Sequence, residues 1–66
     1  MIKLTKFTGE ELFLNPELIK TLEAGGDTIV HLTTGDRLLV RESPEEIKDK
    51  FLAFKKEVFA GFTYET

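Results

Sequence analysis

The four residues from Ser43 to Glu46, with the sequence SPEE, constrain the fold more than any other stretch of this chain. A serine hydroxyl can accept a hydrogen bond from the backbone N–H groups at the start of a helix, and proline suits the first helical position. A glutamate three residues after the serine completes a capping box. The sequence therefore predicts a helix that begins at Pro44.

The residues after this start have the spacing of an amphipathic helix over about residues 44–58. One apolar stripe recurs at intervals of four, three and four residues, which is the period of one helix face. Its members are Ile47, Phe51, Phe54 and Val58. Gly61 is the predicted end of the helix, because glycine readily adopts the left-handed conformation that closes helices. Residues 60–66 are expected to form a short, loosely held tail.

Five short strand candidates precede the helix. They are the segments 2–7, 11–15, 17–24, 28–33 and 37–41. The third segment also suits a helical turn, but its shortness and the glycine pair that follows it favour a strand. Gly35 stands where a type I turn with a bulge needs a left-handed residue, so the last two strands are expected to form a hairpin.

The predicted architecture is α+β: a small antiparallel sheet of about five short strands built from hairpins, then one C-terminal amphipathic helix, in a single domain over residues 1–66. A chain of this length buries only roughly 60% of the surface that its unfolded form exposes. Domains of this size are supported by disulfides, a metal, very regular packing or self-association. With no cysteine and one histidine, the chain lacks the usual ligands of structural zinc. Very regular packing and self-association remain, and of these two we expect self-association into a homo-oligomer.

The charged residues are mixed along the chain rather than gathered in blocks. Nine basic and 12 acidic side chains give a net charge of −3. No stretch offers the dense positive charge that nucleic-acid backbones attract, which argues against a nucleic-acid partner. The N-terminus lacks the apolar core of a signal peptide, and no apolar run approaches the length of a membrane span. We expect a cytoplasmic protein.

No group of residues indicates catalysis, a cofactor or a metal. The adjacent glutamates at 10–11 and 45–46 suit solvated positions and a helix start. His31 has no cysteine or second histidine to join it, and beside Val30 on a strand it is expected to face away from the core. The glycines form no phosphate-binding pattern. The sequence predicts a non-enzymatic protein with no catalytic, cofactor-binding or metal-binding residues.

Two small groups of apolar residues remain outside the predicted core. If Val40 faces the helix, Ile29 and Leu39 lie on the opposite face of the sheet, where a single helix cannot cover them. On the helix, Leu52 and Phe59 lie off the main stripe. Because exposed apolar patches mark interaction surfaces, we predict that these two groups, one on the sheet and one on the helix, carry self-association or the docking of a partner.

Seven short motifs, taken together in their order and spacing, allow the chain to be compared with known protein families. They are MIKLT at the N-terminus, GEE at 9–11, LNPELI at 14–19, EA at 23–24, DTI at 27–29, LTTG at 32–35 and VRESPEE at 40–46. In these motifs the chain resembles the small flagellar FlbD family of swarming motility proteins, over residues 1 to about 58. It departs from the family pattern at Thr8-Gly9 and Thr34-Gly35, where Asn-Gly is expected. These differences alter the turn chemistry rather than the predicted fold.

The resemblance implies a non-enzymatic accessory protein that is encoded among flagellar genes and required for swarming motility. Such a protein would raise the power, or torque, of the flagellar motor through the membrane-bound stator units. A flagellar motor or stator component is then the expected partner, and the inner face of the membrane near the motor is the expected location. The family pattern assigns no binding residues, so the predicted interface depends on the apolar residues alone.

A second interpretation is a small nucleic-acid-binding regulator of flagellar gene expression. Residues 19–51 are loosely similar to the strand-strand-helix pattern of LytTR-type DNA-binding domains. The MIKLT start is similar to that of the CsrA family of RNA-binding regulators. Under this interpretation Lys20, Arg37 and Arg41 would contact phosphates. The acidic balance of the chain argues against it.

Overall fold

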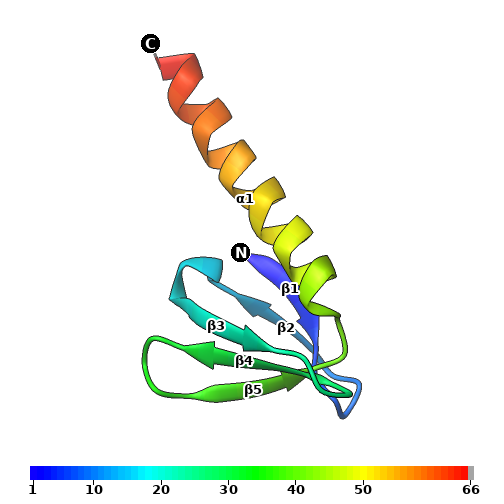
Figure 1. Cartoon of the computed structure of the whole chain (residues 1–66). Coiled ribbons are helices and arrows are strands. Elements are labelled where there is room, and N and C mark those ends of the chain that lie inside the picture. Colours follow the sequence, from blue (N-terminus) through cyan, green and yellow to red (C-terminus); the bar gives the residue numbers. More distant parts are fainter. Residues whose placement is uncertain (66) are drawn as a thin grey trace.

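Within residues 1–65, whose backbone the computed structural model describes, five short strands are followed by one long helix (Figure 1). Side chains are described for residues 1–58. The strands are β1 (Ile2–Thr5), β2 (Glu11–Leu14), β3 (Ile19–Glu23), β4 (Thr28–Leu32) and β5 (Arg37–Val40). A short 3-10 helix, η1 (Pro16–Leu18), precedes β3, and the helix α1 (Pro44–Glu65) follows β5. The predicted α+β fold is confirmed, with a strand over most of the segment 17–24.

The strands form two antiparallel sheets, whose β1–β2 and β4–β5 turns are built alike. The sheets have the orders β1-β2 and β3-β4-β5. The Gly9 N–H donates to the Lys6 carbonyl at 2.9 Å, and the Gly35 N–H donates to the Leu32 carbonyl at 3.0 Å. Both glycines have positive φ, 98° and 96°, which a residue with a side chain adopts only at a cost. These features fit the bulged turn predicted at Gly35, and the first hairpin uses it as well.

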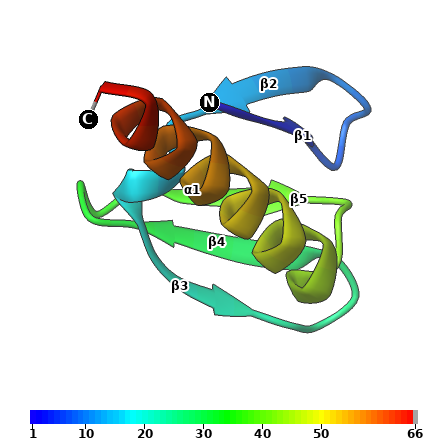
Figure 2. The same cartoon turned by 90° about the horizontal axis from the view of Figure 1, so that it is seen from above.

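The ends of β1 and β5 join the two sheets. Lys6 forms an isolated antiparallel bridge with Val40. Next to this bridge, the Arg41 N–H donates to the Thr5 carbonyl at 2.8 Å. The order across the joined surface is therefore β2-β1-β5-β4-β3. Seen from above, α1 crosses this surface between the β1–β2 pair and β3 (Figure 2).

Alternate residues of the strands face α1 and form the core. The buried apolar side chains, each at most 8% exposed, are Ile2, Leu4, Leu14, Val30, Val40 and Ile47. Partly buried side chains pack around them; they are Leu12, Ile19, Leu22, Leu32, Leu38 and Phe54. Among residues 1–58, all the buried residues of this core cluster except Ile47 come from strands, and the buried Pro16 belongs to η1. The apolar stripe of α1 is thus buried mainly at the beginning of the helix.

The start of α1 is the predicted capping box. The Ser43 hydroxyl accepts from the Glu46 N–H at 3.2 Å, and the Glu46 carboxylate accepts from the Ser43 N–H at 3.3 Å. The predicted helix end at Gly61 and the tail over 60–66 are corrected, because α1 continues to Glu65. One glycine inside a helix costs only about 1 kcal/mol relative to alanine, which is too little to end it. Figure 1 shows α1 extending beyond the sheets. Nowhere in the described part of the chain is a helix both long and apolar enough to cross a membrane.

Glu42 connects β1, β4 and the start of α1. Its carboxylate accepts from the Thr5 N–H and from the Thr5 hydroxyl, both at 2.8 Å. Its carbonyl accepts from the buried Thr28 hydroxyl at 2.6 Å. Burial alone would raise the pKa of Glu42, but the hydrogen bonds from Thr5 and from its own backbone, with the charge of Lys50, outweigh burial and lower this pKa. The carboxylate is therefore held in its charged form.

Candidate interaction surface

The outer face of the joined sheet carries a row of three apolar side chains, Phe7, Ile29 and Leu39, which we call the outer patch. The register sets Ile29 opposite Leu39. The Phe7 N–H donates to the Leu39 carbonyl at 3.1 Å, next to the Lys6–Val40 bridge. Because side chains alternate along a strand, Phe7 and Leu39 face away from the core that holds Val40. Phe7 is 56% exposed, Leu39 is 43% exposed and Ile29 is half-buried.

Two arginines flank the outer patch. Arg37 and Arg41 lie two residues before and after Leu39, so alternation places all three on one face. The Arg41 guanidinium donates from Nη2 to the Phe7 carbonyl at 3.0 Å, which holds the β1–β2 turn against the end of β5. An apolar centre beside guanidinium groups is a composition that protein interfaces favour. This surface fits a partner that offers an apolar side chain flanked by carboxylates.

His31 also lies on the outer face, as its position beside Val30 predicts. Its Nε2 lies 2.8 Å from Oε1 of Glu23, on the neighbouring strand β3. This contact ties the two strands together, and no third titratable group completes a catalytic set around it in the described structure. Among the side chains of residues 1–58, no group of three or more His, Cys, Asp or Glu residues could hold a metal.

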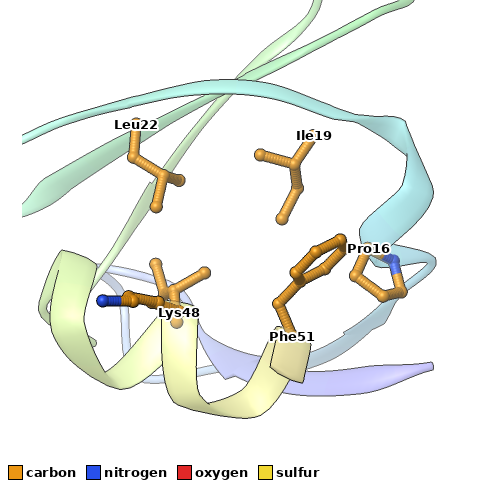
Figure 3. Close-up of a pocket in the computed structure, with 6 residues that line it drawn as sticks. Pro16, Ile19, Leu22, Lys48 and Phe51 are labelled. Atoms are coloured by element: carbon orange, nitrogen blue, oxygen red, sulfur yellow. The ribbon is translucent and has the colours of Figure 1, made fainter. Parts of the chain in front are cut away.

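A groove of about 240 Å³ lies between η1, β3 and α1 (Figure 3). Its lining residues are Pro16, Ile19, Leu22, Ile47, Lys48 and Phe51. All of them except Lys48 are apolar, and cofactor sites need several convergent polar groups to orient their ligand. The groove therefore suits an apolar side chain better than a cofactor.

An ion pair links α1 to η1 close to Phe51, one of the residues that line the groove. Lys55 of α1 pairs with Glu17 of η1, and its Nζ lies 5.6 Å from the centre of the Phe51 ring. This distance is within the range of a cation–π contact. Both side chains are partly exposed, so the pair contributes modestly to holding α1 beside η1.

The two predicted groups of interface residues, one on the sheet and one on the helix, lie on different surfaces. Ile29 and Leu39 meet in the outer patch, whereas Leu52, which is 54% exposed, lies on the solvent side of α1. Since α1 packs on the inner face of the strands, Leu52 and the outer patch are on opposite sides of the molecule. Phe59 lies outside the described side chains. Phe7 was not among the predicted interface residues, although continuing the alternation of β1 through Lys6 would have placed it on the outer face.

The three residues predicted as phosphate contacts do not gather into one cluster. Arg37 and Arg41 lie four residues apart, about 13 Å at about 3.3 Å per residue. Lys20 lies on β3, which β4 separates from β5. The carboxylate of Glu23 lies on the same outer face, beside His31. The positive charges are thus spread apart, and an acidic group lies on the same face as the two arginines.

A comparison with protein-family models matches residues 1–59 to FlbD, described as flagellar and swarming motility proteins. Searches of curated proteins and of solved structures found no match. The matched residues include all five described strands, the outer patch and the first part of α1. The resemblance seen in the short motifs is therefore confirmed over nearly the whole chain, and the chain belongs to the FlbD family of flagellar and swarming motility proteins.

Proposed function

We propose that this chain is a non-enzymatic accessory protein that raises the torque of the flagellar motor by docking on its stator units through the outer patch. Membership of the FlbD family supports a role in motility. The outer patch is the observation that carries the docking role, because the family gives no reaction to catalyse and the patch offers apolar surface to a partner.

The chemistry of the outer patch supports recognition of a short acidic and apolar segment. Burial of Phe7 and Leu39 against a partner would supply most of the binding free energy, since aromatic and large aliphatic side chains dominate interface energetics. Arg37 would orient the partner through charge, which governs specificity and association rate more than affinity. The stator segment that fits is one with a leucine- or phenylalanine-like side chain between carboxylates.

Substitutions in the outer patch can separate an effect on docking from an effect on folding. Its side chains face away from the core, and the backbone hydrogen bonds beneath it do not depend on their identity. Surface substitutions away from packed positions usually change the free energy of unfolding by less than about 0.5 kcal/mol. A loss of function after such a substitution would therefore report docking rather than folding.

The test is the torque of tethered cells, with flagella counted, in a strain that lacks the gene and is complemented with different variants. Leu39→Glu should behave like the deletion, with torque lost at unchanged flagellar number, because its carboxylate would stand in the centre of the patch and neutralise the flanking arginines. Phe13→Glu is the matched control: Phe13 is 71% exposed on β2, outside the patch, and torque should be retained.

Two outcomes would contradict the proposal. Wild-type torque with a folded, normally abundant Leu39→Glu variant would exclude the outer patch as the docking surface. A deletion strain with unchanged torque but fewer flagella would instead favour a regulator of flagellar gene expression. In that case affinity for nucleic acid should fall steeply as the salt concentration rises.

A further inference from the structure

The solvent side of α1 carries a stripe of residues whose charges would match those of an identical, antiparallel helix. Its members, which we call the back stripe, are Glu45, Asp49, Leu52, Ala53 and Lys56, and all of them are exposed. At about 100° per residue they lie opposite Ile47, which is in the core. Leu52, at 54% exposed, lies in the middle of this stripe. Figure 2 shows α1 in front of the sheets, with no strand over its outer side.

Asp49 and Lys56 lack an oppositely charged residue at the positions where ion pairs form within a helix, three or four residues away. For Asp49 these positions hold Glu45, Glu46, Leu52 and Ala53. For Lys56 they hold Leu52, Ala53, Phe59 and Ala60. Asp49 even has a like charge four residues before it, which disfavours the helix unless a cation approaches from outside. By contrast, Lys55 contacts Glu17.

We propose that α1 pairs antiparallel with α1 of a second copy of the chain through the back stripe. A two-fold axis between positions 52 and 53 sets Asp49 of each copy against Lys56 of the other, and Leu52 of each against Ala53 of the other. Such a surface is self-complementary, as a closed dimer requires. The small side chain of Ala53 lets the helices approach closely around Leu52. A parallel pair would instead set like charges against each other.

Pairing with a second copy would also bury additional apolar surface, which a small domain lacks. A chain of 66 residues has a small core, and pairing would cover Leu52 and the aliphatic part of Lys56. The contact is one face of one helix, which is smaller than a standard interface, so the dimer is weak and depends on concentration. The outer patch lies on the other side of the molecule and stays accessible, so this pairing does not depend on the proposed docking on stator units.

The test is sedimentation velocity of the full chain at concentrations from about 10 μM to about 1 mM, the range of weak association. The mass should rise from 7.5 kDa toward twice that value. Asp49→Lys and Lys56→Asp should each raise the dissociation constant at least about tenfold, because each places two like-charge pairs in the dimer. Mixed together, the two variants should form a heterodimer. The first carries lysine at positions 49 and 56 and the second carries aspartate at both, so opposite charges face each other again.

Glu57→Lys is the matched control, because it changes the net charge as much as Asp49→Lys does but lies off the back stripe. It should leave the dissociation constant within about twofold of the wild-type value. Far-ultraviolet circular dichroism of each variant checks that the helix is intact. The proposal fails if the wild-type chain stays at 7.5 kDa up to about 1 mM, or if either reversal pairs as the wild type does. It also fails if the mixed reversals stay monomeric.

Discussion

Leu39 and Val40 are neighbours on β5, yet they belong to different parts of the molecule. Val40 is 0% exposed and packs in the core, whereas Leu39 is 43% exposed in the outer patch. The inner face sets the free energy of unfolding, because its side chains are closely packed. The outer face has less influence on the free energy of unfolding, so its apolar residues are available for the proposed docking. Substitutions on the two faces should therefore separate stability from function.

The largest loss of stability is expected from Leu4→Ala on the inner face. Leu4 is 0% exposed in the centre of the core, and a buried leucine-to-alanine change costs about 2 to 5 kcal/mol of the free energy of unfolding. Urea denaturation measures this directly. A loss of less than about 1 kcal/mol would show that the core can collapse around the missing side chain, and would weaken the contrast between the faces.

A smaller loss is expected from Glu42→Gln at the junction of β1, β4 and α1. The amide keeps the shape of the side chain but loses the charge, and its NH2 group replaces one of the two oxygens that accept from Thr5. A hydrogen bond to a charged group contributes about 1.5 to 3 kcal/mol, and the amide oxygen still accepts, so a loss of about 1 to 2 kcal/mol is expected in urea denaturation. Thr5→Val, which removes only the hydroxyl donor, is the matched control and should lose less.

The carboxylate of Glu42 makes the free energy of unfolding depend on pH. The pKa of Glu42 is lower in the folded chain than its ordinary value of 4.5, so the unfolded chain binds more protons in that region. Its contribution is complete above about pH 4.5 and is lost as the pH falls through the folded-state pKa. The difference in free energy of unfolding between the wild type and Glu42→Gln should shrink below pH 4.5. An unchanged difference down to about pH 3 would contradict this assignment.

Ser43→Ala should cost about 1 kcal/mol, because it removes the hydroxyl that accepts from the Glu46 N–H. The effect is local to the helix start, so helix content and stability should fall together in thermal denaturation followed by circular dichroism. Ser43→Asp keeps an acceptor at the cap and should retain the wild-type stability. Equal losses of stability in both variants would show that the capping hydrogen bond does not account for the contribution of Ser43 to stability.

The smallest change in stability is expected from Leu39→Ala in the outer patch. It repeats the chemistry of Leu4→Ala at an exposed site, and its effect on the free energy of unfolding should stay within about 0.5 kcal/mol. Motor torque, measured in tethered cells, should nevertheless fall. A loss of stability close to that of Leu4→Ala would show that the outer patch belongs to the packed structure, and would remove the contrast between the faces.

Local features of the fold could be predicted from the sequence, and long-range features could not. The capping box at Ser43 and the bulged turn at Gly35 depend on neighbouring residues, so their residue types were sufficient. The continuation of α1 past Gly61 was not predictable from one glycine, whose cost is small compared with that of ending a helix. Alternation along β1 indicates the outer face for Phe7. The bridge from Lys6 to Val40, which joins residues far apart in the chain, is what sets Phe7 beside Leu39.

The irregular register of β3 has a consequence for solubility. β3 is the last strand in its sheet, and an edge strand can recruit a strand from another chain and begin aggregation. The shift between Ile19 and Thr21 breaks the regular pairing at Lys20, and η1 ends the extended backbone just before it. A bulge and a lysine are two devices that protect sheet edges. Lys20, which fits poorly as a phosphate contact, therefore disfavours strand addition at this edge of the sheet.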